Sequence, residues 1–205
     1  KAKSKLPKDF FIKNRGVGNV PKHREKYIVV MHHPETTKFN QTYNQISQTI
    51  DAIIKIKDIK IVWLWPNIDA GSDIISKQLR ILRENKLMTN ISFFKNFSPE
   101  EYIKLIYNSE CLVGNSSSGI RESSFLSIPV VNIGSRQKNR ERGFNVIDVG
   151  YDKIEIFNAI IKQMKRKKIK KSNLYGDGFS QKKIAKILNN IFKKEVSVEK
   201  VLNYL

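Results

Sequence analysis

The sequence has a single cysteine, Cys111, among its 205 residues, which excludes a disulfide scaffold and a cysteine-ligated zinc site. It contains no apolar run near the roughly 18 residues that a membrane-spanning helix requires. Its first residues, Lys1 to Pro7, lack the apolar segment of a secretory signal. Three histidines without acidic partners at metal-ligand spacing give no reason to expect a metal. We therefore expect a cytoplasmic protein with no membrane partner, no metal and no other cofactor.

Acidic residues are scarce, since 19 Asp and Glu stand against 38 Lys and Arg and the formal net charge is +19. A positive field suits an anionic small molecule, and it also raises the alternative of a basic nucleic-acid-binding module. The densest basic run, residues 162–171, has no aromatic side chain interleaved for base stacking and follows a helical pattern. We interpret this run as a solvated helix end and loop, and we expect no nucleic-acid partner.

The apolar residues, 40% of the chain, are those of a folded protein and form six short runs, at residues 27–31, 60–65, 90–94, 111–113, 129–133 and 145–149. Short continuous runs are typical of strands buried on both faces. Helical patterns separate or follow them, at 40–56, 72–86, from Ser98 onward, 120–125, 153–164 and 180–193. The alternation predicts an α/β fold, a Rossmann-like parallel sheet of about six strands with helices on both faces.

The domain organisation follows from the same pass along the chain. Residues 1–26 are polar and basic with little periodicity, and we interpret them as a linker or the remnant of a missing N-terminal domain. Residues 27–194 form the Rossmann-like domain, and residues 195–205 are expected to form a C-terminal helical tail.

In a parallel α/β sheet, ligands bind at the carboxyl ends of the strands, so the residues after each strand carry the information about function. The fourth run leads into Gly114-Asn-Ser-Ser-Ser-Gly-Ile-Arg-Glu122. Small residues between a strand and a helix start present free N–H groups and the positive end of a helix dipole, and the hydroxyls of Ser116 and Ser117 add donors for a phosphate or diphosphate. Glu122 suits the hydroxyls of a ribose, and Arg136, after the next strand, can reach the same phosphates. Alternatively, the serines only cap a helix and Glu122 only complements its dipole.

Three further side chains stand near these strand ends. His33 follows the first strand, where it can contact an anion or move a proton, whereas the alternation of a strand turns its neighbour His32 to the other side. Phe97 and Tyr102 flank the helix after the third strand, and either ring could stack on a nucleobase or simply pack in the core.

Five ordered segments, in register between residues 27 and 192, resemble the hydrolysing UDP-N-acetylglucosamine 2-epimerases of the sialic-acid pathway. They are His33-Pro-Glu-Thr-Thr37, Pro66-Asn-Ile-Asp-Ala-Gly-Ser72, Gly114–Glu122, Pro129-Val-Val-Asn-Ile-Gly-Ser-Arg-Gln137 and Tyr175-Gly-Asp-Gly178. The non-hydrolysing epimerases are less similar, because their serine is typically followed by two glycines. The resemblance implies a glycosyltransferase-B-type architecture, of which this sequence matches the C-terminal, nucleotide-binding half.

The resemblance also implies roles for individual residues. It implies that His33 is catalytic and that the UDP contacts come from Asn67, Phe97, Tyr102, Ser116, Ser117, Glu122 and Arg136. In this scheme the two serines, Arg136 and Asn67 hold the diphosphate. Glu122 holds the ribose, while the Phe97 backbone and the Tyr102 ring hold the uracil.

By the same resemblance, the full-length enzyme converts UDP-N-acetylglucosamine to N-acetylmannosamine and UDP without a cofactor, and it is a homo-oligomer. The family's acid–base carboxylates belong to the N-terminal half, so the chain is expected to bind a UDP-sugar without turning it over. Relatives act on a di-acetamido sugar, and the sequence does not decide between the two. The nucleotide-binding half of a glycosyltransferase of the same architecture stays open as an alternative.

Overall fold

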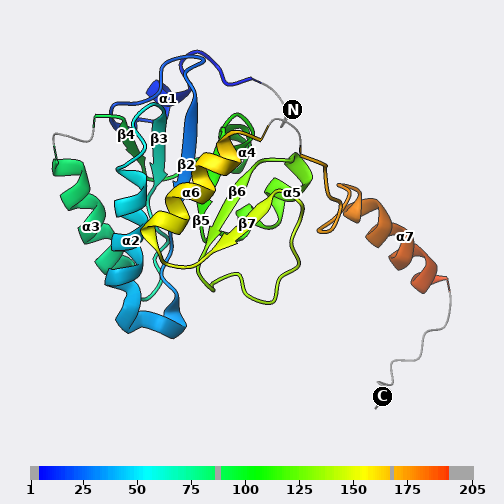
Figure 1. The fold of residues 1–205 in the computed structure, drawn as a ribbon. Helices are drawn as coiled ribbons and strands as arrows, with labels where there is room; N and C mark the ends of the chain where they lie inside the picture. The colour runs from blue at the N-terminus through cyan, green and yellow to red at the C-terminus, as the bar shows by residue number, and fades with distance from the viewer. Residues whose placement is uncertain (1–4, 86–88, 167–168, 194–205) are drawn as a thin grey trace.

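The computed structural model describes residues 5–85, 89–166 and 169–193 (Figure 1). Within them one sheet contains seven strands in the order β1-β4-β3-β2-β5-β6-β7. Their bounds are β1 (Val17–Gly18), β2 (Tyr27–Met31), β3 (Lys60–Leu64), β4 (Ile91–Phe94), β5 (Cys111–Gly114), β6 (Val130–Ile133) and β7 (Val146–Val149). The six predicted strands are all present and parallel, and the sheet gains β1, which pairs antiparallel with β4.

The strand order places a topological switch point between β2 and β5. The chain winds outward from β2 through β3 to β4, then returns to β5 on the other side and continues to β6 and β7. The last residues of the two central strands, Met31 and Gly114, are register partners. The loops after them therefore leave the sheet side by side, which is where ligands bind in doubly wound folds.

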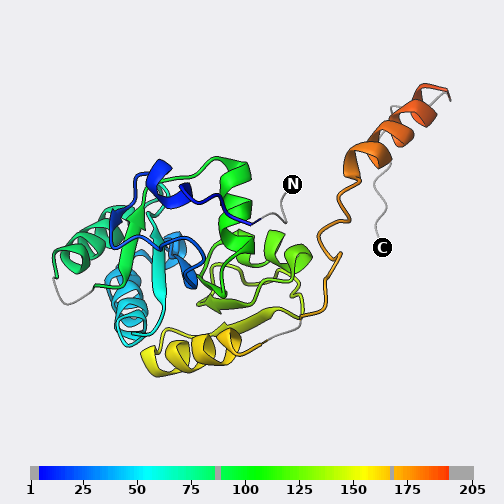
Figure 2. The ribbon, with the colours of Figure 1, turned by 90° about the horizontal axis from the view of Figure 1, so that it is seen from above.

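Helices cover both faces of the sheet, as predicted (Figures 1 and 2). On one face lie α2 (Thr42–Ile53), α3 (Ser72–Glu84) and α6 (Lys153–Met164), packed against Ile28 and Val30 of β2. On the other lie α1 (Phe10–Lys13), α4 (Pro99–Tyr107) and α5 (Glu122–Leu126), packed against Tyr27 and Val29. Alternate residues of one strand thus serve two cores, which is why the strands read as continuous apolar runs. None of the helices in the described ranges is long and apolar enough to cross a membrane.

The described part of the N-terminal segment packs on the second face. Phe10 and Phe11 are only 3% and 7% exposed, and the ring of Phe10 stacks on that of Phe97 with centroids 5.6 Å apart. Helix α1 and strand β1 were not expected within residues 1–26, because each is too short to show a period. The assignment of these residues to a linker or a preceding domain stays a prediction.

Helix α7 (Ser180–Phe192) extends away from the sheet at the C-terminal end of the described chain (Figures 1 and 2). All of its side chains are exposed, including an apolar stripe at Ile184, Ile187, Leu188, Ile191 and Phe192. Its helical pattern was predicted correctly, whereas the expected tail at residues 195–205 lies outside the described residues.

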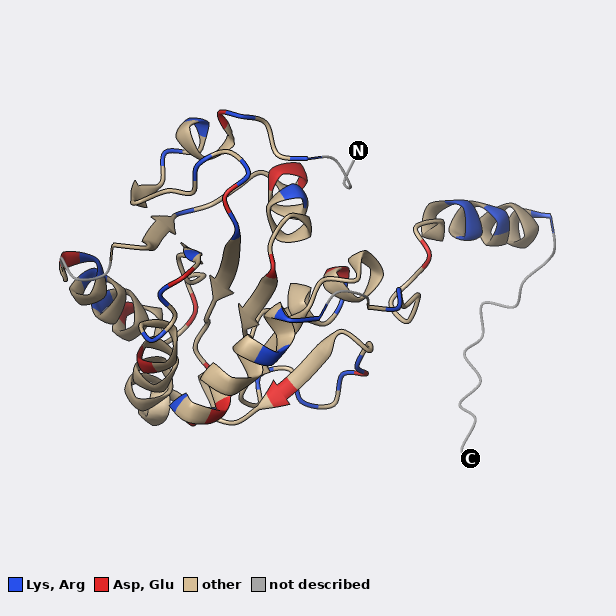
Figure 3. Cartoon of the chain, turned by 45° about the horizontal axis from the view of Figure 1, so that its top comes forward, with Lys and Arg blue, Asp and Glu red and all other residues tan. Residues whose placement is uncertain are grey.

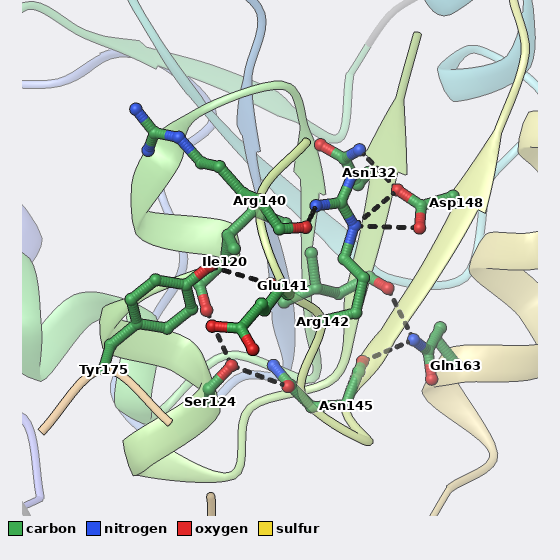
Figure 4. Close-up of polar contacts among 11 residues, drawn as sticks. Ile120, Ser124, Asn132, Arg140, Glu141, Arg142, Asn145, Asp148, Gln163 and Tyr175 are labelled. Atoms are coloured by element: carbon green, nitrogen blue, oxygen red, sulfur yellow. Dashed lines mark hydrogen bonds and ion pairs between the residues drawn. The ribbon is translucent and has the colours of Figure 1, made fainter. Parts of the chain in front are cut away.

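A buried polar network links α5, α6, β6 and β7 (Figure 4). The amide of Gln163 donates to the carbonyls of Val130 and Asn145, and the hydroxyl of Ser124 donates to Ile120 O and Asn145 Oδ1. Gln163, Asn145 and Ser124 are all at most 1% exposed. Since buried polar groups are costly when unpaired, the network fixes the segment between β6 and β7 in one arrangement.

Candidate functional site

Asn115 joins the strand ends at the switch point. The backbone N–H of His33 donates to Asn115 Oδ1 at 2.8 Å, and Asn115 Nδ2 donates back to the His33 carbonyl at 2.7 Å. The carbonyl of Asn115 accepts from Gln137 Nε2 at 2.8 Å and from Arg136 Nη1 at 3.4 Å. One fully buried residue therefore fixes the ends of β2, β5 and β6 together. Sequence reasoning gave Asn115 no role, although an amide directly after a buried strand was a signal for one.

The loop after β5 offers backbone donors to an anion. Gly114 turns the chain at φ +131°, where an added Cβ would lie 1.9 Å from the Met31 carbonyl oxygen, so only glycine fits. The Ser116 side chain then caps the short 3₁₀ turn η2 (Ser117–Gly119). The N–H groups of Ser116 and Ser117 donate to no other described residue, and both side chains are partly exposed. These two amides are free to bind an oxyanion.

The α-helix expected directly after this loop begins later than predicted. The 3₁₀ turn comes first, and α5 starts at Glu122 and has only five residues. A contribution of the α5 dipole to this loop stays a prediction, whereas the individual N–H groups of the loop are present in the structure. Glu122 is the first residue of α5 and its side chain is exposed.

Arg136 brings a cation to the same edge. Its guanidinium contacts the Asn115 carbonyl and also Asp69 Oδ2, at 3.5 Å, in the loop after β3. The Arg136 side chain is 28% exposed, so an anion can approach it from solvent. Phosphate oxygens would compete with the Asp69 carboxylate for a guanidinium that is already oriented.

His33 lies beside this guanidinium and is buried. Its Nδ1 accepts the backbone N–H of Asn67 at 3.2 Å. Burial, and secondly the positive charge of Arg136, lower the pKa of His33 to about 4, against a smaller opposing effect of Asp69. The imidazole is therefore neutral at pH 7 and carries its proton on Nε2.

His32 points to the opposite side of β2, as the alternation predicted. It is fully buried, and its Nδ1 lies 3.1 Å from Thr49 Oγ1 of α2. Burial lowers its pKa to about 3. His32 belongs to the core, and His33 alone faces the strand-end loops.

The two aromatic candidates are placed differently from one another. The ring of Phe97 is 7% exposed and packs against Phe10 and Phe94, so stacking of this ring on a base is contradicted and only its backbone is left for a ligand. The hydroxyl of Tyr102 hydrogen-bonds Ser118 Oγ and Met31 Sδ. Burial raises the pKa of Tyr102 well above its usual value. Tyr102 thus holds Ser118 of the loop after β5 in place, and a contact of its ring with uracil stays a prediction.

A pocket of about 340 Å³ adjoins Glu122. Ile103 and Phe125 form apolar walls, while Tyr175 and Gly176 form part of its rim. Tyr175 is held in place by its hydroxyl, which donates to the Glu141 carbonyl (Figure 4). Apolar walls beside a carboxylate suit a nucleoside, whereas Ser116, Ser117 and Arg136 do not line this pocket.

The remaining basic side chains are spread over the described part of the chain (Figure 3). Lys and Arg lie on several helices and loops around the domain and on α7 (Figure 3). Among the residues that the structure describes, no group of three or more His, Cys, Asp or Glu side chains could hold a metal ion.

A doubly wound sheet whose switch point gathers free amides, an arginine and a neutral histidine has the architecture of a nucleotide-binding domain. Comparison with known families agrees, because the family described as UDP-N-acetylglucosamine 2-epimerase matches residues 5–189. The chain belongs to this family.

Individual relatives cover the chain well but extend beyond it. The UDP-N,N'-diacetylbacillosamine 2-epimerase (hydrolyzing) of Legionella pneumophila is 32% identical over 82% of this chain and 43% of its own length. The polysialic acid biosynthesis protein P7 of Escherichia coli is 38% identical over 67% of this chain and 34% of its own length. The Methanocaldococcus jannaschii UDP-GlcNAc 2-epimerase in complex with UDP-GlcNAc and UDP is similar in fold, with a TM-score of 0.63 and 19% identity. The similarity covers 81% of this chain and 46% of that protein. The chain thus spans less than half the length of these relatives.

Proposed function

We propose that this chain is the UDP-binding half of a hydrolysing UDP-N-acetylglucosamine 2-epimerase, and that the whole protein converts UDP-N-acetylglucosamine to N-acetylmannosamine and UDP. The observation that carries the proposal is the placement of Arg136 on the Asn115 carbonyl, beside His33 and the serine loop. The family membership and the name of the Legionella relative support the nucleotide and the hydrolysing reaction.

In this proposal the diphosphate lies between the β5 and β6 ends. The amides and hydroxyls of Ser116 and Ser117 donate to its oxygens from one side, and the Arg136 guanidinium from the other. Asn67 assists from the loop after β3. The uridine extends toward the pocket at Glu122, whose carboxylate accepts from the ribose hydroxyls, and the Phe97 backbone and the Tyr102 ring contact the uracil.

The reaction requires charge stabilisation on the leaving group. When the bond from the sugar C1 to the diphosphate breaks, negative charge develops on the departing oxygen. Preorganised N–H groups, the Arg136 cation and the His33 Nε2–H stabilise that charge. Departure of UDP with loss of the C2 proton, followed by addition of water, gives the free sugar with the configuration at C2 inverted.

Among the described residues, the two carboxylates near Arg136 and His33 are both already paired. Asp69 pairs with Arg136, and the Glu35 carboxylate is engaged by Ser135 and Tyr151. We therefore propose that the acid–base carboxylates come from the remaining part of the full-length, homo-oligomeric enzyme and that this chain alone binds UDP without turnover. No metal or cofactor enters this scheme.

Two experiments test the proposal. UDP should raise the melting temperature of this chain, whereas duplex DNA should give no stabilisation that survives physiological salt; the opposite result would favour a nucleic-acid-binding module.

The full-length protein supplied with UDP-N-acetylglucosamine should release N-acetylmannosamine and UDP without an acceptor. Turnover that requires an acceptor would favour a glycosyltransferase.

The sugar has a second candidate because of one specific relative. The Legionella protein is named for UDP-N,N'-diacetylbacillosamine, a di-acetamido sugar. Parallel assays of the full-length protein with both UDP-sugars decide between them by their kcat/KM values.

A further inference from the structure

The proposed reaction makes no use of Glu35, although this carboxylate is buried at the edge of the candidate site. Glu35 follows His33 by two residues in the loop after β2, and it is 3% exposed. It accepts hydrogen bonds from Ser135 N at 2.6 Å, Ser135 Oγ at 2.7 Å, Arg136 N at 3.0 Å and Tyr151 Oη at 2.8 Å. The Lys38 ammonium lies 3.6 Å away. Such complete pairing is what a buried carboxylate requires.

The carboxylate of Glu35 is ionised despite its burial. Burial raises its pKa, but the hydrogen bonds from Ser135 and Tyr151 and the charge of Lys38 together outweigh burial, and the net direction is downward. At neutral pH the group is therefore a permanent internal anion.

This internal anion occupies an arrangement of donors that otherwise suits a phosphate. Gly134, at φ +74°, turns the chain at the end of β6, and the next two backbone N–H groups, of Ser135 and Arg136, converge on one Glu35 oxygen. Successive N–H groups in a turn form a typical anion-binding concavity. Because Glu35 fills it, these two amides are not available to a ligand, and Arg136 can contribute through its side chain.

The hydrogen bonds to Glu35 also fix the backbone of Arg136, from which its side chain extends. Its backbone N–H is bound to Glu35, and its guanidinium reaches the Asn115 carbonyl across the switch point. On the far side, Tyr151 donates to Glu35, and a Cβ added at Gly134 would clash with the Tyr151 ring, so only glycine fits at this turn.

We propose that Glu35 is a positioning residue that fixes the backbone of Ser135 and Arg136 so that the Arg136 guanidinium faces the diphosphate of the UDP-sugar. The inference rests on the proposed function. It differs from a merely structural role in one respect: the contribution of Glu35 to UDP affinity passes through the Arg136 side chain.

A double-mutant cycle on the full chain, with UDP as the titrant in calorimetry, tests this coupling. Glu35→Gln keeps the shape but weakens the bonds to a charged acceptor, and we expect about tenfold weaker UDP binding. Arg136→Ala also weakens binding, and Glu35→Gln added to it should cause no more than about a further twofold loss. Losses that multiply, or unchanged affinity in Glu35→Gln, overturn the proposal. Glu25→Gln is the matched control, since this carboxylate lies before β2 and accepts from Lys22 N; it should leave UDP affinity unchanged.

Tyr151→Phe decides the question where Glu35→Gln does not fold. It removes one of the four hydrogen bonds, and we expect a loss of about threefold that disappears in the Arg136→Ala background. The same loss in both backgrounds overturns the proposal. The two levels of failure are separable: a wild-type chain that does not bind UDP refutes the proposed function together with this inference, whereas a chain weakened by Arg136→Ala but not by the Glu35 and Tyr151 variants refutes this inference alone.

Discussion

The backbone N–H of Asn67 donates to Nδ1 of His33 over 3.2 Å, and this contact assigns the proton of the neutral imidazole to Nε2. The loop after β3 thereby sets the tautomer of a residue at the end of β2. A neutral Nε2–H can donate to a phosphate oxygen without adding a second positive charge beside Arg136. The function proposed for His33 depends on this neutrality, which has a measurable consequence for stability.

The free energy of unfolding should fall as the pH drops from about 6.5. Burial lowers the pKa of His33 to about 4 and that of His32 to about 3, whereas both have a pKa near 6.5 when unfolded. Between the folded and unfolded pKa values the unfolded state binds more protons than the folded state. The contribution of the two neutral histidines to the free energy of unfolding is therefore fully present above pH 6.5 and is lost as the pH falls toward 4 and then 3. We expect a slope of about 2 kcal/mol per pH unit between pH 6 and 5, and about 1 in His33→Gln. Urea unfolding at fixed ionic strength measures both slopes, and equal slopes would show that His33 is protonated in the folded state.

The two substitutions Ser117→Ala and Ser117→Pro separate the hydroxyl from the amide. Ser117 opens the 3₁₀ turn and follows Ser116 at ψ 145°, a conformation that a following proline accepts. Ser117→Ala keeps the N–H, and we expect a loss in UDP affinity of about threefold. Ser117→Pro removes the N–H as well, and we expect at least tenfold. Calorimetry with UDP measures both, and melting temperatures control for folding. Similar affinities for the two variants would mean that the amide does not bind the diphosphate.

Glu122→Ala should discriminate between ligands. The ribose contact is lost while the diphosphate contacts remain, so UDP binding should weaken by about tenfold and inorganic diphosphate binding by less than twofold. Glu84→Ala, an exposed carboxylate in the last turn of α3, is the control and should change neither affinity. Equal losses for the two ligands would remove the ribose role from Glu122.

The buried polar network of Figure 4 should contribute to the free energy of unfolding and not to UDP binding. Gln163→Met keeps the length of the side chain but removes the two hydrogen bonds that the Gln163 amide donates to the carbonyls of Val130 and Asn145, while the Asn145 carbonyl still accepts from the Val130 N–H. We expect the free energy of unfolding to fall by about 2 kcal/mol, because two buried hydrogen bonds are lost. The neighbouring exposed Lys162→Met should change it by less than about 0.5 kcal/mol. Denaturant unfolding of the two variants checks the difference, and a loss below 1 kcal/mol in Gln163→Met would contradict it.

The sequence predicts the sheet well, because its strands depend on local patterns. Continuous apolar runs define strands buried on both faces, and alternation correctly separates His33 from His32. The helix expected from Ser98 onward is also confirmed, and its start is local too, because Ser98 and Glu101 form a capping box.

Contacts between distant residues could not be predicted in this way. Asn115 meets His33 across 82 positions, and Glu35 meets Ser135 across 100, so no window of the sequence contains either pair. Strand β1 has two residues and carries no period. The apolar stripe of α7 is exposed in the structure, and the helical pattern in the sequence does not specify whether such a stripe packs on the sheet.

A crystal structure of this chain soaked with UDP would locate the nucleotide on the domain. The diphosphate should lie within hydrogen-bonding distance of the Ser116 and Ser117 amides and the Arg136 guanidinium, with the ribose at Glu122. UDP bound elsewhere on the domain, or a diphosphate that leaves Arg136 paired only with Asp69, would contradict this placement.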